Sequence, residues 1–478
     1  MLPDGVRPAT IHIQDGKITR VGPYEDRGDV NSSSAPASPK LGDERPSEGW
    51  AAERYDAADL VVSPGIVDTH VHINEPGRTD WEGFDTATRA AAAGGATTVV
   101  DMPLNSVPAT TTAAALEAKR TAARGQCHVD VAFWGGVVPG NAGFLDELVE
   151  AGVRGFKCFL VPSGVDEFPA VDERALREAL PIVSRRRVPL LVHAEAPALI
   201  RDAGAKGLQP GVYATYLATR PPEAEVEAIR SIVRLAREFG VHAHIVHVAS
   251  AEAADEVARA KADGIAITAE TCPHYLTFAA EDVPDGATEF KCAPPVREAR
   301  HREALWTALT NGTLDLVATD HSPAPPALKC PGDFMKAWGG IASLELSLAT
   351  VWTSSREEVS RLKSQVSESL KGESSGSLQP SNLRLDLCSV TRWMSEASAR
   401  LAGLHDRKGR IAPGYDADLV VWDPDAGWTV DSSRLQQRHK LTPYAGRRLT
   451  GRVHTTFLRG TPVWRDGRLI AAGSGRLL

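Results

Sequence analysis

Short apolar runs alternate with helical segments along most of the chain, and this alternation limits its possible folds more than any other feature. Eight apolar runs lie within residues 65–322; they are 65–72, 96–103, 129–137, 155–160, 188–196, 242–250, 265–273 and 314–322. The segments between them, such as 172–187 and 223–240, have the apolar spacing of amphipathic helices, and several end in glycine. Eight β/α units over about 250 residues predict a (β/α)8 TIM barrel with its active site at the C-terminal ends of the strands.

The two ends of the chain have a different pattern. Residues 1–66 and 405–478 contain alternating, β-rich segments with Gly and Asp at the turns, so we expect one small β-sandwich domain built from both termini. The barrel domain would then span 67–404. Residues 26–50 and 353–383 are rich in Ser, Pro, Gly and charge, which predicts two flexible inserts.

Composition and net charge limit the kinds of molecule that the protein is expected to bind. The net charge of −8 offers no basic patch for nucleic acid or an anionic membrane, so we expect a small-molecule substrate. No apolar run approaches a transmembrane length of ~18 residues, and the first residues do not resemble a signal peptide. The six cysteines are scattered singly, as free thiols in a reducing compartment would be. These features favour the cytoplasm; the ending GSGRLL lacks the S-K-L signal but leaves a peroxisomal location open.

Several candidate metal ligands stand at the ends of expected strands. His70 and His72 are two residues apart in a strand, so both side chains point to the same face, as in a chelate. An isolated H-x-H pair is equally consistent with ordinary hydrogen-bonded histidines, and a catalytic metal needs further ligands. His193, His247 and Asp320 each stand where an apolar run stops, and together they predict a metal centre.

The run 242–250 offers three histidines. Alternation along the strand puts His247 on the opposite face from His242 and His244, and only His247 lies at the strand's end. We therefore choose His247 as the ligand and interpret the other two as structural.

Lys157 is an unusual residue for a barrel strand. One interpretation is that its stem packs inward while its ammonium reaches the mouth of the barrel. Divalent cations, however, would repel an ammonium, whereas a neutral lysine amine reacts with carbon dioxide to give an anionic carbamate that can bridge two metals. We hypothesise that carbamylated Lys157 is such a bridge.

The motifs carry a family resemblance. The segments DTHVH, GFKCFL, LVHAE, HIVHVAS and VATDHSP resemble those of the cyclic amidohydrolases in the amidohydrolase superfamily. The resemblance is strongest to the allantoinase group, through HINEPGRTDWEGFDTATRAAAAGG, DMPLNSVPAT, GDFMKAWGGI and RKGRIAPGYDADLVVWDPD, and it covers nearly the whole chain apart from the two inserts.

The resemblance implies hydrolysis of the hydantoin ring of allantoin to allantoate, a step of purine degradation, by a hydroxide bridging two divalent metals. It assigns His70 and His72 to one metal and His193 and His247 to the other, with carbamylated Lys157 between them and Asp320 on the first. Zinc suits these ligands best, although manganese or cobalt also fits. Asp320 would act as general base and then acid. The resemblance also suggests a homotetramer.

Differences from the sequence motifs of related enzyme groups narrow the choice of activity within the superfamily. Dihydroorotases have an arginine two places after the second histidine, where this chain has Asn74. Dihydropyrimidinases and hydantoinases have a tyrosine shortly after the bridging lysine, and KCFLVPSG contains none. A dihydropyrimidinase or hydantoinase remains the alternative enzyme, and a non-catalytic dihydropyrimidinase-like scaffold protein is the alternative of another class.

Three residues on loops after strands are candidates for substrate binding. They are Asn105, Cys292 and Ser322, which could bond the ring and ureido groups, Cys292 mainly through its backbone. Turn formation and simple packing explain the same residues equally well.

Overall fold

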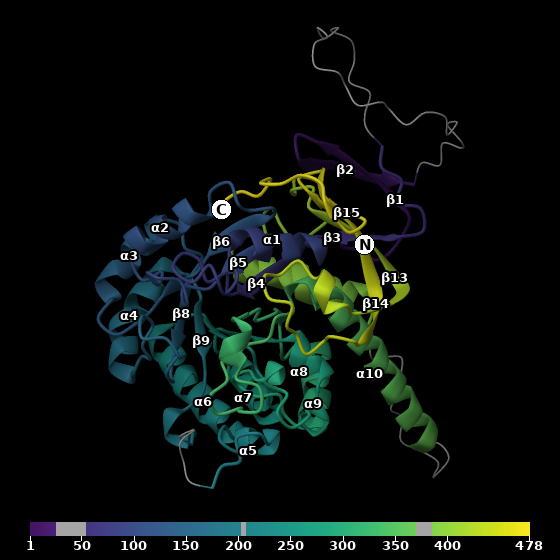
Figure 1. The fold of residues 1–478 in the computed structure, drawn as a ribbon. Coiled ribbons are helices and arrows are strands. Elements are labelled where there is room, and N and C mark those ends of the chain that lie inside the picture. The colour runs from purple at the N-terminus through teal and green to yellow at the C-terminus, as the bar shows by residue number, and fades with distance from the viewer. Residues whose placement is uncertain (25–53, 202–206, 370–384) are drawn as a thin grey trace.

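A barrel of parallel strands ringed by helices forms the larger part of the molecule (Figure 1). The computed structural model describes residues 1–24, 54–201, 207–369 and 385–478. The barrel strands are β4 (Ile66–Val71), β5 (Ala96–Asp101), β6 (Asp130–Phe133), β7 (Gly135–Gly136), β8 (Phe156–Phe159), β9 (Leu190–His193), β10 (Ala243–Ile245), β11 (Ile267–Thr271) and β12 (Leu316–Val317).

The strands close into a ring in sequence order. One sheet runs β4-β5-β6 and the other β12-β11-β10-β9-β8-β7, with all pairs parallel. β6 and β7 form one strand interrupted at Trp134, whose N–H donates to Asp101 O while that of Gly135 donates to Gly155 O. The ring closes where Val71 bridges His321 in parallel. The predicted (β/α)8 barrel is confirmed.

The helices between the strands pack their apolar faces on the barrel. They are α1 (Phe84–Ala93), α2 (Ala113–Ala123), α3 (Leu145–Glu150), α4 (Glu173–Arg186), α6 (Pro222–Phe239), α7 (Ala251–Ala262) and α9 (Ala299–Thr310). α6 shows why such a segment is helical: Pro222 occupies the first turn, where its missing N–H costs nothing, and Gly240 ends the helix at φ 64°. Its stripe of buried residues, including Ile229 and Ile232, faces the barrel core.

A second, antiparallel β unit is formed by segments from both ends of the chain. Its larger sheet has the order β16-β15-β14-β13-β3. These strands are β16 (Arg468–Leu469), β15 (Thr461–Arg465), β14 (Arg448–Leu458), β13 (Leu419–Thr429) and β3 (Val61–Pro64). The hairpin of β1 (Ala9–Gln14) and β2 (Lys17–Pro23) packs on it, because Ile18 shares a core with Leu419, Val421 and Phe457. This is the sandwich expected from the two termini.

The expected inserts differ in outcome. Residues 26–50 lie outside the described part of the chain. The flexible loop expected over 353–383 is wrong for 353–369, which form the second part of α10 (Ser347–Ser369). α10 is held by Thr353, whose Oγ1 accepts a hydrogen bond from the Thr450 N–H at 2.7 Å, and by Val359, which packs on the main core. Its Ser-rich composition concealed this apolar face; residues 370–383 are not described.

Within the described residues, no helix combines the length and the apolar character needed to span a bilayer.

Candidate metal centre

All six predicted metal ligands lie at the C-terminal rim of the barrel. His70 is in β4 and His72 directly follows it, while Lys157 is in β8 and His193 ends β9. His247 and Asp320 come two and three residues after the ends of β10 and β12. Because parallel strands end at the same edge, these side chains converge although they are up to 250 residues apart in sequence.

The backbone at this rim adopts a conformation that residues other than glycine rarely use. His247 has φ 41° and Asp320 φ 46°, and the nearby Asn74 and Asn105 have φ 67° and 69°. Such left-handed residues outside glycine concentrate at functional sites, where the surrounding fold holds them in place. At this rim they turn the side chains of His247 and Asp320 away from the path of a regular strand.

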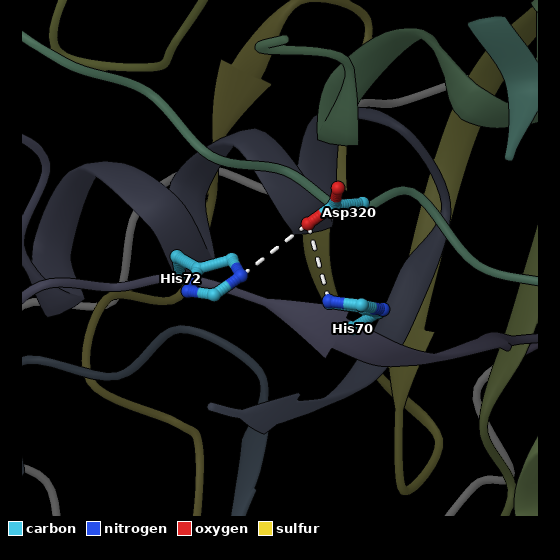
Figure 2. A group of neighbouring side chains, drawn as sticks. All are labelled: His70, His72 and Asp320. Atoms are coloured by element: carbon cyan, nitrogen blue, oxygen red, sulfur yellow. Dashed lines mark ion pairs between the residues drawn. The ribbon is translucent and has the colours of Figure 1, made fainter. Parts of the chain in front are cut away.

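His70, His72 and Asp320 form one close group (Figure 2). Asp320 Oδ1 lies 3.1 Å from His70 Nε2 and 3.3 Å from His72 Nε2. All three side chains are buried. Burial opposes ionisation of Asp320, but the two histidines outweigh it and hold the pKa of this carboxyl well below its usual range. The group therefore offers two imidazole nitrogens and a carboxylate to one point.

His193 and His247 form a second group beside the first. His193 Nδ1 and His247 Nε2 are 3.0 Å apart, and the ring centroids of His70 and His247 are 5.5 Å apart. Burial lowers the pKa of both His193 and His247. Their facing nitrogens are therefore those of neutral imidazoles, the form that binds metals.

Lys157 is fully buried near both groups. Its Nζ has no hydrogen-bond partner among the described residues, and it lies 5.1 Å from the centroid of the Phe159 ring. Phe159 in turn stacks on His193. Burial lowers the pKa of Lys157 to about 8, so roughly a tenth of the amine is neutral at pH 7, far more than for an ordinary lysine.

Two buried glutamates orient the histidines, and both were missed from the sequence. Glu270 Oε1 accepts a hydrogen bond from His70 Nδ1 at 2.5 Å, and Glu195 Oε2 lies 2.8 Å from His193 Nε2. Carboxylates commonly fix metal-binding histidines in this way. The available signal was a charged residue inside an apolar run, at Glu270 in 265–273 and at Glu195 in 188–196.

The residues at this rim fit divalent metal ions. Their donors are imidazole nitrogens and a carboxylate, which suit zinc, manganese or cobalt. The buried amine of Lys157 lacks a partner among the described residues, and His247 Nδ1 also has none there. Unpaired polar atoms in a buried cluster of this kind are expected where a ligand completes the site.

The three candidate substrate residues differ in whether their polar atoms already have hydrogen-bond partners. Asn105 Nδ2 lies 3.4 Å from His72 Nδ1, and Asn105 Oδ1 is buried with no partner in the described chain. Ser322 follows Asp320 by two residues, and its N–H donates to Ile341 O. The Cys292 carbonyl accepts the Tyr216 hydroxyl at 2.7 Å, so that backbone oxygen already has a donor.

A second acidic cluster is not a metal site. Asp130, Asp416 and Asp418 lie close together, but Lys408 Nζ contacts all three, at 2.6, 3.1 and 2.5 Å. The ammonium occupies the place that a cation would take. The cluster joins β6 of the barrel to residues next to β13, so its role is to hold the two parts of the chain together.

Comparisons with known proteins agree with this arrangement. The model of the Amidohydrolase family matches residues 61–463. An allantoinase of Streptomyces avermitilis is 46% identical, with 100% of this chain and 96% of that protein covered. An allantoinase of Arabidopsis thaliana is 42% identical over 88% of this chain and 81% of that protein.

Solved structures show the same fold. An L-hydantoinase (dihydropyrimidinase) from Arthrobacter aurescens superposes with a TM-score of 0.83 at 30% identity, covering 99% of this chain and 96% of that one. A dihydropyrimidinase from Brevibacillus agri gives a TM-score of 0.81 at 28% identity, covering 98% and 94%. The family model that matches residues 61–463 and the allantoinases that match most of the chain place it in the amidohydrolase family, within its allantoinase group.

Proposed function

We propose that this chain is an allantoinase, which hydrolyses the ring amide of allantoin to give allantoate. The observation that carries the proposal is the buried group of His70, His72 and Asp320 in a chain 46% identical, end to end, to an allantoinase. Asn74, at the place where dihydroorotases carry an arginine for a substrate carboxylate, favours a neutral ring. Asn74 is buried, and its Oδ1 has no partner among the described residues.

Two divalent ions would be held here. His70, His72 and Asp320 would bind one, His193 and His247 the other, with Lys157 between them. When bound, such ions polarise the substrate carbonyl and lower the pKa of water toward ~7. We take zinc as the metal, because imidazole and carboxylate ligands suit it.

Lys157 would serve as a carbamate. Its neutral Nζ attacks carbon dioxide, one N–C bond forms, and one proton is released to solvent. The product replaces a buried neutral amine by an anion with two oxygen donors. The lowered pKa of the amine and its lack of a partner in the described chain support this assignment.

Asp320 would move the proton. Oδ1 faces His70 and His72, whereas the second carboxylate oxygen points away from both histidines (Figure 2). A carboxylate oxygen in this position can accept the proton of the attacking water and return it to the departing ring nitrogen. The low pKa of Asp320 keeps it ionised at the start of the cycle.

Asn105, Cys292 and Ser322 would contact the ring and ureido groups. Asn105 is the best placed of the three, since its amide adjoins His72 and its Oδ1 is unpaired within the described residues. Burial raises the pKa of the Cys292 thiol to about 12, so the thiol stays protonated and does not act as a nucleophile.

A second enzymatic candidate is a dihydropyrimidinase or hydantoinase, because the solved structures of similar fold are enzymes of these two kinds. A non-catalytic scaffold is less consistent with the complete set of ligands. The deciding experiment measures ring opening of allantoin, dihydrouracil and unsubstituted hydantoin by metal-replete protein. We expect the highest kcat/KM with allantoin; a preference for dihydrouracil would reject the proposal, and no turnover of any ring would favour the scaffold.

We also propose, from the family resemblance, a homotetramer in the cytoplasm. The free state of all six cysteines is consistent with a reducing compartment.

A further inference from the structure

A buried chain of hydrogen bonds crosses the barrel interior below the metal centre. It begins at His70, whose Nδ1 lies 2.5 Å from Glu270 Oε1, and continues from Glu270 Oε2 to His244 Nε2 at 3.0 Å. His244 Nδ1 is 2.9 Å from Thr268 Oγ1, which is 2.8 Å from His242 Nε2. The chain therefore links β4, β10 and β11, and it includes both histidines that we had interpreted as merely structural.

The donors and acceptors in this chain fit together in one direction. Ionised Glu270 only accepts, so His70 must donate through Nδ1 and His244 through Nε2. His244 Nδ1 then carries a lone pair and accepts the Thr268 hydroxyl, whose oxygen accepts the N–H of His242. One carboxylate thus fixes the hydrogen-bonding direction of His70 and His244 and, through Thr268, of His242. For His70 it keeps a hydrogen on Nδ1 and leaves Nε2, the nitrogen that faces Asp320, for a metal ion.

The end of this hydrogen-bond series that is farthest from the metal centre lies at the opposite end of the barrel. His242 and Thr268 line a cavity of about 490 Å³ at the N-terminal ends of β10, β11 and β12. Its other wall comes from the π-helical turn η8 (Arg392–Glu396) and α12 (Ala397–Leu401), including Trp393. The series of hydrogen bonds therefore spans the barrel from this cavity to the predicted metal ligands.

We propose that Glu270 is a positioning residue that holds His70 in its metal-binding tautomer, and that His244 and Thr268 hold Glu270, so that metal affinity depends on the opposite end of the barrel. The inference rests on the proposed binding of a metal by His70. It assigns a role to residues that the reaction itself does not use, because none of Glu270, His244 and Thr268 belongs to the proposed ligand or substrate set.

The first test is the substitution Glu270→Gln. The new side-chain amide would present an NH2 group to one of the two histidines that now donate to the carboxylate, so one of them must change its tautomer or lose its bond. We expect Glu270→Gln to weaken binding of Co²⁺ or Zn²⁺ roughly 10- to 100-fold, measured by chelator competition on metal-depleted protein without substrate. The visible absorption spectrum of bound Co²⁺ should also change, since it reports the ligand geometry.

The second test acts far from the metal, where a folding defect is less of a concern. Thr268→Val removes the hydroxyl with little change of shape, and we expect metal binding to weaken about 2- to 10-fold, the effect of one neutral hydrogen bond. Thr268→Ser should restore it. Thr98→Val is the matched control, because Thr98 is buried in β5 and its hydroxyl has no partner among the described residues.

The outcomes separate clearly. Reduced metal affinity in Glu270→Gln and Thr268→Val, with Thr98→Val unchanged, supports the proposal. Wild-type affinity in Glu270→Gln, or equal effects of Thr268→Val and Thr98→Val, would overturn it. Because metal binding is read without substrate, failure of this proposal leaves the allantoin assay as an independent test of the proposed function.

Discussion

Lys119 is the residue whose replacement tests the energetics of the barrel interior most sharply. It lies on α2, is fully buried, and donates from Nζ to Asp101 Oδ2 at 2.5 Å and to Met102 O at 2.9 Å. Asp101 Oδ1 in turn accepts the Ile73 N–H at 2.8 Å, next to His72. Lys119→Met keeps the apolar stem but leaves the Asp101 carboxylate buried without its cation.

The loss of folding stability expected for Lys119→Met can be worked out from the protonation of Asp101. An unpaired buried carboxylate costs about 3–5 kcal/mol. Asp101 can avoid this cost by binding a proton, which at pH 7 requires about 4 kcal/mol for a group with an ordinary pKa near 3.9, and at pH 5 about 1.5 kcal/mol. Burial already raises the pKa of Asp101 in the presence of Lys119. The folded variant would hold this extra proton, so its loss of stability relative to wild type should grow as pH rises from 5 to 7.

The assay is guanidinium denaturation of metal-free protein at pH 5 and pH 7, followed by circular dichroism and tryptophan fluorescence. The double variant Lys119→Met/Asp101→Asn removes the charge and keeps an acceptor for Ile73, so it should recover most of the lost stability. Lys336→Met is the control, because Lys336 is exposed and its ion pair with Asp333 is worth at most about 1 kcal/mol. The reasoning would be refuted if Lys119→Met lowered the free energy of unfolding by less than about 0.5 kcal/mol at pH 7, or if the decrease did not change with pH.

Three further changes test the site and its surroundings. Lys157→Ala should lose metal and activity, with partial recovery of both in short carboxylic acids; full activity without additive would refute the carbamate. Asp320→Asn should lower kcat by roughly 10²- to 10⁴-fold in steady-state assays, and an unchanged kcat would remove its role in proton transfer. Burial raises the pKa of Glu345 to about 7 from 4.5, so the folded state holds its proton and stability falls as pH rises between these values. Glu345→Gln, which can still accept the Gln436 N–H, should abolish this part of the pH dependence of denaturation; an unchanged dependence would contradict it.

The sequence predicted the barrel well, because each strand and helix carries its own local pattern. The ends of apolar runs also indicated where His70, His193 and Asp320 stand, since a parallel barrel collects strand ends at one rim. Glu270 and Glu195 could not be assigned in this way. The role of Glu270 depends on which strands are neighbours and on the register that brings it to His70, 200 residues away. α10 was missed for a related reason: its partners, such as Thr450, are distant in sequence, and its own residues are mostly polar.

The proposed function requires side chains from separate strands of the barrel to hold a pair of divalent cations. The deciding measurement is elemental analysis of the purified protein after dialysis against metal-free buffer. We predict about two divalent ions per chain in the wild type. The double variant His70→Ala/His72→Ala should lose at least the ion assigned to that pair. A wild-type protein that opens allantoin with no divalent metal, or a double variant that keeps its full metal content, would contradict it.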